Sequence, residues 1–397
     1  MDPIHNPFAP GAGAPPPELA GRGPLLAKAG IVLARVKAGR PERSLLMVGL
    51  RGVGKTVLLN RIRELAESEG FRTVSVEAHE DKPLPALLLP PLRQLLVGLD
   101  RMATVSAKAK RALRVFKSFF DGVRVKVAAI EIGIDVDPEI GTADSGDLEA
   151  DLPALFQALG EAAADRRVPV AMLIDELQYL SETELSALIM AMHQIAQRQL
   201  PVVLVGAGLP QLVGLAGRAK SYAERLFEFP EVGALAPADA HAALQEPAAA
   251  QRVAFTGPAL DAIYAQTQGY PYFLQEWGYQ SWNLAQATPI GVDVARRATE
   301  DSIRRLDQNF FRVRFDRLTP REKDYLGALA EMGDDAQRSG DIAERLGMKV
   351  QSVAPLRSGL IRKGMIYSPA HGDTAFTVPL FADFMKRVIP DERRSRN

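Results

Sequence analysis

Residues 49–56, Gly49-Leu50-Arg51-Gly52-Val53-Gly54-Lys55-Thr56, are the stretch that decides the fold of this chain. They match the pattern G-x-x-x-x-G-K-[ST] and stand between an apolar segment, Ser44 to Gly49, and a helical pattern from Lys55 to Gly70. Glycines let such a loop wrap a phosphate, whose oxygens accept hydrogen bonds from N–H groups at the helix start. Lys55 can then reach the β- and γ-phosphates, and Thr56 can bind Mg²⁺. A chance glycine-rich turn would not need a strand before it and a helix after it. The motif therefore predicts a nucleotide site with Mg²⁺.

Two acidic residues follow a second apolar segment. Val168 to Ile174 runs directly into Asp175 and Glu176. A carboxylate at the C-terminal end of a parallel strand is where an α/β sheet places its ligand chemistry. Asp175 is therefore predicted to hold Mg²⁺, directly or through water, and Glu176 to orient or deprotonate the attacking water, with Lys55 as the other catalytic residue. Two acids at a strand end are often only a helix N-cap, but the phosphate loop upstream favours the catalytic interpretation.

Strands and helices alternate through the first 230 residues. Further strands are predicted at 71–78 and 202–205, which implies βαβ units and a parallel sheet covered on both faces. From about residue 234 to 317 the pattern is helical, and Thr319-Pro320-Arg321-Glu322 is a capping box that starts another domain. The predicted class is therefore α/β with additional helical regions.

Composition and charge exclude several classes of protein. Lys plus Arg and Asp plus Glu both number 48, so the net charge is zero and binding through bulk positive charge is excluded. The chain has no cysteine, which excludes disulfides, zinc ribbons and thiol chemistry. No apolar run approaches the about 18 to 20 residues that span a bilayer, and the Pro- and Gly-rich N-terminus lacks a signal-peptide layout. We expect a cytoplasmic protein with no membrane partner.

The pairing of GLRGVGKT at 49–56 with MLIDE at 172–176 resembles the Walker A and Walker B motifs of P-loop ATPases of the AAA+ and STAND groups. Within these groups the sequence is most similar to bacterial and archaeal ATPases related to origin-recognition proteins. The likeness extends to Leu19-Ala20-Gly21-Arg22, a box that lies near the adenine in such proteins. The resemblance implies a P-loop NTPase core, a helical lid and a C-terminal winged helix-turn-helix. The predicted boundaries are an extended Pro/Gly-rich arm at 1–24, the core at 25–232 with an insert at about 84–150, the lid at 233–317 and the winged helix at 318–397.

The sequence departs from the AAA+ pattern at two places. The strand after the Asp-Glu strand ends in 205–208, Val-Gly-Ala-Gly, where many family members carry a polar sensor residue. The lid stretch Gly269-Tyr270-Pro271-Tyr272 has no arginine for the γ-phosphate. Its Gly-x-Pro resembles the STAND lid motif, in which Pro271 would pack on the nucleotide base, although a plain helix break explains it as well. Missing sensors favour slow turnover, closer to a switch than to a motor.

Arg225 lies where the family often has an arginine finger that reaches a neighbouring subunit. The resemblance thus implies a catalytic role for Arg225 and a nucleotide-dependent homo-oligomer. The alternative is a surface arginine paired with Glu224 or Glu228.

An insert between the second strand and the Asp-Glu strand separates its charges. Residues 101–126 contain eight basic residues and one acid, whereas 131–151 contain eight acids and no Lys or Arg. The basic half predicts an amphipathic helix with Leu113, Phe116 and Phe120 on one side, and alternation over 123–136 predicts two strands or one bulged strand. This segment either contacts a partner or a nucleic acid, or is a solvated face whose halves neutralise each other; we favour the latter.

The C-terminal region has the element order of a winged helix-turn-helix, with helices at 341–347 and 352–363 and a hairpin at 365–378. Ser352 as the N-cap would place Pro355 in the first helical turn, where proline is tolerated. The candidate contacts to double-stranded DNA are the basic residues Lys349, Arg357, Arg362 and Lys363. Winged helices also bind proteins, so a protein partner stays open.

The sequence as a whole predicts an ATP- and ADP-binding, Mg²⁺-dependent ATPase that couples nucleotide state to presentation of a winged helix, to DNA in the first hypothesis. The alternative is a STAND-type regulatory switch or scaffold that binds a protein partner and uses hydrolysis as a timer.

Overall fold

The computed structural model describes residues 1–11, 16, 18–102, 106–124, 136–370 and 372–395. The chain divides into two compact units. We call Gly23–Val48 with Lys55–Glu231 the sheet unit, and Met1–Arg22 with Gly49–Gly54 and Val232–Asn397 the helical unit. Within the described ranges, no helix combines the length and the apolar character needed to cross a membrane.

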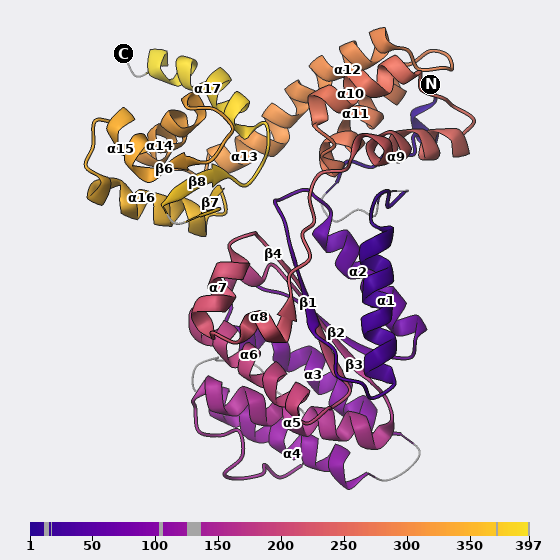
Figure 1. Cartoon of the computed structure of the whole chain (residues 1–397), viewed down its shortest axis with the longest axis vertical. Helices are drawn as coiled ribbons and strands as arrows, with labels where there is room; N and C mark the ends of the chain where they lie inside the picture. Colours follow the sequence, from indigo (N-terminus) through magenta and orange to yellow (C-terminus); the bar gives the residue numbers. More distant parts are fainter. Residues whose placement is uncertain (12–15, 17, 103–105, 125–135, 371, 396–397) are drawn as a thin grey trace. The chain divides into compact units, whose positions relative to one another are not determined.

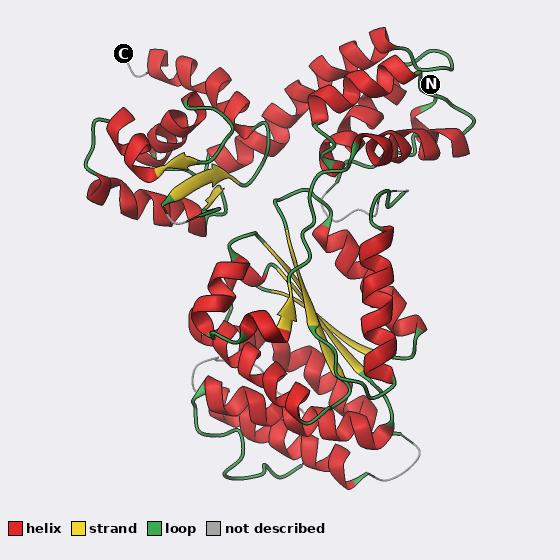
Figure 2. Cartoon of the chain, viewed as in Figure 1, coloured by secondary structure: helices red, strands yellow, loops and turns green. Residues whose placement is uncertain are grey.

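The sheet unit is built on five parallel strands in the order β2-β3-β4-β1-β5 (Figures 1 and 2). The strands are β1 Ser44–Val48, β2 Arg72–Glu77, β3 Val170–Asp175, β4 Val202–Gly208 and β5 Phe227–Glu228. Every residue of β1, β3 and β4 is buried, because helices cover both faces of the sheet. This double burial explains why the strands read as continuous apolar runs, and it confirms the predicted α/β class.

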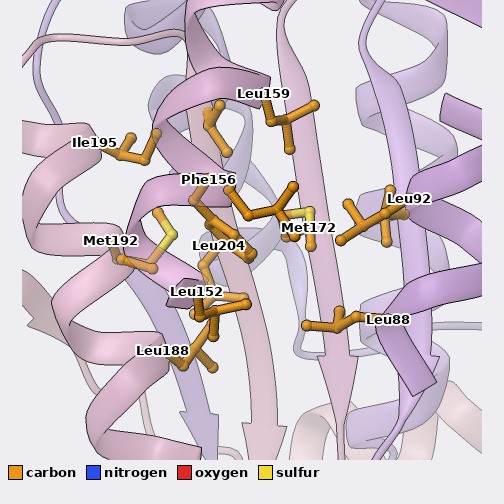
Figure 3. Close-up of a cluster of buried hydrophobic side chains, with 14 of the residues drawn as sticks. Leu88, Leu92, Leu152, Phe156, Leu159, Met172, Leu188, Met192, Ile195 and Leu204 are labelled. Atoms are coloured by element: carbon orange, nitrogen blue, oxygen red, sulfur yellow. The ribbon is translucent and has the colours of Figure 1, made fainter. Parts of the chain in front are cut away.

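Helices on the two faces of the sheet form separate layers. They are α1 Gly23–Lys37, α2 Lys55–Ser68, α3 Leu84–Asp100, α4 Ala107–Arg124, α5 Leu148–Arg166, the 3₁₀ turn η2 Leu177–Tyr179, α6 Glu182–Gln197, α7 Leu212–Ala219 and α8 Ala223–Leu226. Figure 3 shows the layer formed by α3, α5 and α6. In it, Met172 of β3 and Leu204 of β4 pack against Phe156 of α5 and Met192 of α6. This core fixes β3 and β4 side by side, with their C-terminal ends at one edge of the sheet.

The basic half of the insert is the predicted amphipathic helix. In α4, Leu113, Phe116 and Phe120 are buried in the core. Arg111 on the outer side forms ion pairs with Glu139 (3.0 Å) and Glu161 (3.2 Å). These pairs agree with a face whose opposite charges neutralise each other. The predicted strands over 123–136 fall mainly on residues outside the described ranges.

Helices dominate the first part of the helical unit, as predicted. They are η1 Pro3–His5, α9 Pro237–Ala250, α10 Gly257–Thr267, α11 Pro271–Leu284, α12 Val292–Arg305, the π-helix η3 Leu306–Phe311 and α13 Arg312–Phe315. Near the start of the segment predicted to be an extended arm, Pro3–His5 form a short 3₁₀ helix, and Phe8 is only 2% exposed and packs against Gly278 of α11. A Cβ at Gly278 would lie 2.7 Å from the Phe8 ring, so this glycine makes room for the arm.

The C-terminal elements come in the predicted order, with an added strand and a last helix. They are α14 Pro320–Glu331, β6 Gln337–Arg338, α15 Ser339–Arg345, α16 Val350–Arg362, β7 Ile366–Tyr367, β8 Asp373–Phe376 and α17 Phe381–Ser395. β6, β8 and β7 form a small antiparallel sheet. The capping box of Thr319 and Glu322 at the start of α14 is confirmed.

The predicted start of α16 is wrong. Lys349, not Ser352, is the N-cap, because its backbone is extended and the Ser352 N–H already donates to the Lys349 carbonyl at 2.9 Å. Pro355 therefore lies inside the helix, in its second turn. Its side chain is exposed, so water can replace the intrahelical hydrogen bond that proline cannot donate.

Candidate functional site

The end of β3 and the start of α2 bring three predicted residues together. The Thr56 hydroxyl donates a 2.6 Å hydrogen bond to Oδ2 of Asp175, the last residue of β3. Asp175 is only 7% exposed, and burial raises its pKa; the hydrogen bond from Thr56 and the charge of Lys55 act in the opposite direction. Lys55 is buried as well. The two predicted Mg²⁺ ligands and the predicted phosphate-binding lysine thus share one corner of the sheet.

Glu176 follows Asp175 in a left-handed backbone conformation (φ 54°). Its N–H donates to Asp175 Oδ1 at 2.8 Å, so one aspartate carboxylate anchors both Thr56 and the backbone of Glu176. The Glu176 carboxylate accepts a hydrogen bond from the side-chain amide of Gln178 in η2. The half-buried glutamate therefore has a defined direction at the sheet edge.

The phosphate loop has the backbone that its glycines predict. Gly52 and Gly54 have φ angles of +84° and +91°, a region that other residues rarely adopt. A Cβ at Gly49 would lie 2.1 Å from the Val232 carbonyl oxygen, so a side chain cannot fit there. Around Gly54, by contrast, a Cβ would meet no described atom within 4 Å. The open backbone at Gly54, directly before Lys55, fits a loop that receives a phosphate.

Two groups of the helical unit hold this loop by its carbonyls. The Tyr272 N–H, in the first turn of α11, donates to the Gly52 carbonyl at 3.2 Å. The Arg22 guanidinium donates to the carbonyls of Val53 (3.1 Å) and Gly233 (2.6 Å). Burial lowers the pKa of Arg22 from its ordinary value. The sequence marked both segments through family likeness, but it did not indicate that they bind the loop directly.

Pro271 is the first residue of α11 and immediately precedes Tyr272. The helix start that contains it therefore contacts the phosphate loop, whereas packing of Pro271 on a nucleotide base stays a prediction.

Arg225 lies at the opposite edge of the sheet from the Asp-Glu pair. It belongs to α8, which leads into β5, and β5 pairs in parallel with the first residues of β1. The five residues of β1 span about 17 Å, so Arg225 is about one strand length from the C-terminal edge. Its side chain is exposed, and within the described ranges no ion pair joins it to Glu224 or Glu228, which pairs with Lys28 instead. Arg225 therefore lies away from Asp175 and Glu176 of its own chain.

The four predicted DNA contacts separate into two pairs. Lys349 and Arg362 are exposed at the two ends of α16. The Arg357 guanidinium instead donates to Thr374 (2.8 Å), Ser368 (2.7 Å) and the Asp373 carbonyl (2.7 Å). Lys363 donates to Glu322 Oε2 (2.7 Å) and to the Arg317 carbonyl (3.1 Å). Arg357 and Lys363 therefore connect α16 to other parts of their own domain.

Comparisons with known proteins match two parts of the chain to family models. A family model described as an AAA ATPase domain matches residues 18–205, and a domain of unknown function (DUF8462) matches residues 308–385. A cysteine–tRNA ligase of Anaeromyxobacter sp. is 30% identical over 121 residues. The matched part is 30% of this chain and 23% of the ligase, so the chain spans less than a quarter of that relative.

Three solved structures are similar to this chain at low sequence identity. A Walker-type ATPase of Pyrococcus abyssi is similar with a TM-score of 0.54 and 15% identity, over 93% of this chain and 96% of that one. The Orc1 protein of Aeropyrum pernix in complex with DNA has a TM-score of 0.46 and 16% identity, over 96% and 95% of the two chains. The Holliday junction branch migration motor RuvB of Thermotoga maritima has a TM-score of 0.44 and 14% identity, over 90% and 92%. At 15% identity the likeness to the Pyrococcus abyssi ATPase shows a shared fold only, and the two lower TM-scores show neither fold nor function. Residues 18–205 therefore resemble an AAA ATPase domain, in agreement with the phosphate-loop and Asp-Glu motifs that this part of the chain contains.

Proposed function

We propose that this protein binds ATP with Mg²⁺ through residues 49–56 and Asp175 and hydrolyses it to ADP and phosphate. The observation that carries the proposal is the 2.6 Å hydrogen bond between Thr56 and Asp175, because it joins the two side chains that would hold the ion. The loop N–H groups and Lys55 would hold the phosphates. When bound, ATP supplies the phosphoanhydride bond and Mg²⁺ neutralises negative charge on its phosphates.

Glu176 is the proposed general base, which orients the attacking water and accepts its proton. Slow turnover is part of the proposal. Its support is the absence of a polar side chain at 205–208 and of an arginine in the first turn of α11, both among described residues. Pro271 is proposed to contact the nucleotide base.

Contacts of the phosphate loop within the helical unit support coupling of nucleotide state to the rest of that unit. The Gly52 carbonyl accepts the Tyr272 N–H of α11, and the Arg51 N–H donates to the Thr377 carbonyl beyond β8 at 3.2 Å. A loop that changes with its phosphates would therefore act on α11 and on the C-terminal elements. We infer that hydrolysis changes how residues 318–397 are presented.

We further propose that residues 318–397 form a winged helix-turn-helix that is presented to double-stranded DNA. Three helices followed by the β7–β8 hairpin support this assignment. Lys349 and Arg362 are exposed at the ends of α16 and could contact phosphates, whereas Lys363, which is also exposed, forms an ion pair with Glu322. The alternative is a STAND-type switch for a protein partner, favoured by the internal hydrogen bonds of Arg357 and Lys363.

A homo-oligomer in which Arg225 completes a neighbour's site is also proposed. Its support is the exposed position of Arg225 at the edge of the sheet opposite Asp175. In that case Arg225→Ala keeps ATP affinity but loses turnover, and wild-type turnover per subunit rises with protein concentration. A rate independent of concentration, together with an active mutant, would leave Arg225 as a surface residue.

The test of the proposed function is the rate of phosphate release from ATP, with and without duplex DNA at low salt. We expect slow basal turnover that requires Mg²⁺ and rises with DNA. Turnover without DNA affinity would favour the protein switch, and no ATP binding would contradict the proposal itself.

A further inference from the structure

Gln178 connects the Asp-Glu strand to the end of the neighbouring strand. Its side-chain N–H donates to the Glu176 carboxylate, and its Oε1 accepts a 2.9 Å hydrogen bond from the N–H of Leu209. Leu209 directly follows β4, which pairs with β3 in the sheet. One half-buried amide thus joins the proposed general base to the C-terminal end of the next strand.

The two hydrogen bonds fix the orientation of the Gln178 amide. A backbone N–H can only donate, so the amide oxygen must face Leu209. An ionised carboxylate can only accept, so the amide nitrogen must face Glu176. Gln178 donates to Oε2 of Glu176, and among the described residues no hydrogen bond to the other carboxylate oxygen, Oε1, is seen.

The glycines at the end of β4 make room for this arrangement. A Cβ at Gly208 would lie 3.0 Å from Gln178 Oε1 and 2.9 Å from Leu212 Cδ2. A Cβ at Gly206 would lie 2.3 Å from Leu177 Cδ1. A side chain at either position would therefore collide with η2 or α7. The end of β4 has no polar side chain of its own, and η2 delivers the Gln178 amide to that place.

We propose that Gln178 is a positioning residue that sets the direction in which Glu176 presents its free carboxylate oxygen. This inference rests on the proposed ATPase function. In this proposal the polar side chain at the C-terminal ends of β3 and β4 comes from Gln178 of η2 and not from a residue of β4. The role is distinct from packing, because it depends on the donor end of the amide and acts only through Glu176.

Two substitutions separate the donor end from the acceptor end. Gln178→Met keeps the approximate length of the side chain but removes both hydrogen bonds. Gln178→Glu keeps the acceptor for Leu209 but replaces the donor with a like charge beside Glu176. The matched control is Gln194→Met on α6, because Gln194 is also half-buried and donates a 2.6 Å hydrogen bond to Gln157.

Both substitutions of Gln178 should lower kcat by about tenfold or more, because the general base is misdirected. ATP affinity of Gln178→Met should stay within about twofold of wild type. Hydrogen exchange of the Leu209 amide should become faster in Gln178→Met and stay slow in Gln178→Glu. Gln194→Met should keep the wild-type kcat. If Gln178 only holds the end of β4 in place, kcat will instead follow Leu209 protection, and Gln178→Glu will be as active as wild type.

A double-mutant cycle with Glu176→Gln gives the deciding result. Gln178→Met should add no further loss of kcat in the Glu176→Gln background, because Gln178 acts through Glu176. An additional tenfold loss there, or a wild-type kcat in either Gln178 variant, would overturn the inference while leaving the ATPase function intact. If Glu176→Gln alone hydrolyses ATP like the wild type, or the wild type does not bind ATP, the proposed function fails instead.

Discussion

Charged side chains lie both at the end of β3 and on the helix α16. Those at the end of β3 meet at one place, whereas those of α16 form hydrogen bonds with separate groups of their own domain. At the end of β3, Asp175 binds Thr56 of another element, and the three groups predicted to meet phosphates and Mg²⁺ lie together. On α16, Arg357 and Lys363 direct their donors into their own domain. Parallel strands end at a common edge, so topology itself collects their terminal side chains. The surface of a helix does not bring its side chains to one place in this way. A basic residue there forms hydrogen bonds with the acceptors that lie nearby in its own domain.

Glu176→Gln is expected to have the largest effect, at the end of β3. The amide keeps the size of the side chain but cannot accept a proton, so turnover should fall by about 10²- to 10⁴-fold while ATP still binds. Phosphate release and ATP titration measure the two properties separately. A mutant that hydrolyses at the wild-type rate would move the general base away from this strand.

Arg357→Ala should change stability, because its guanidinium connects α16 to three groups around β8. We expect a loss of about 1–3 kcal/mol, since Thr374 and its neighbours lose charged donors inside the domain. Chemical denaturation of the full chain measures this change. Arg362→Ala is the control on the same helix, and it should change stability by less than about 0.5 kcal/mol. If Arg357→Ala and Arg362→Ala change stability equally, the hydrogen bonds of Arg357 do not stabilise the domain more than an exposed arginine does.

Lys349→Ala combined with Arg362→Ala tests the exposed pair by the salt dependence of DNA binding. Each phosphate contact contributes about −0.9 to the slope of log affinity against log salt, so the double change should flatten the slope by up to about two units. Fluorescence anisotropy with a labelled duplex over a range of salt concentrations gives the slope. An unchanged slope would remove these residues from the interface, and a wild type without affinity for duplex at low salt would favour the protein partner.

Local patterns in the sequence were sufficient to predict most strands of the sheet unit and its first nucleotide-site residues. The apolar runs at β1, β3 and β4 form strands as predicted, because both faces of the sheet are buried there, and the partly buried β2 and the helix from Lys55 also form as predicted. Thr56 and Asp175 could be paired in advance, since the loop motif and a strand end each define where a side chain lies.

Most features that could not be predicted from the sequence are contacts between residues that lie far apart in the chain. Gln178 meets Leu209 across 31 positions, and Arg22 meets Gly233 across 211. Phe8 is buried although its neighbours are Pro- and Gly-rich, because α11 offers a glycine opposite its ring. At α16, the extended backbone of Lys349 starts the helix earlier than the position of Pro355 suggested. The contacts of Gln178, Arg22 and Phe8 each depend on a partner that no local pattern contains, whereas the start of α16 depends on the local backbone of Lys349.

Titration of the wild type and of Lys55→Ala with ATP and Mg²⁺, by calorimetry, tests the central claim most directly. Lys55 is buried next to Asp175 at the start of α2, and its ammonium is proposed to bind the β- and γ-phosphates. The wild type should bind ATP, and Lys55→Ala should raise the Kd by at least about tenfold, or about 1.4 kcal/mol, with an unchanged circular dichroism spectrum. Wild-type affinity in a folded Lys55→Ala protein would contradict the assignment of residues 49–56 as the phosphate-binding loop.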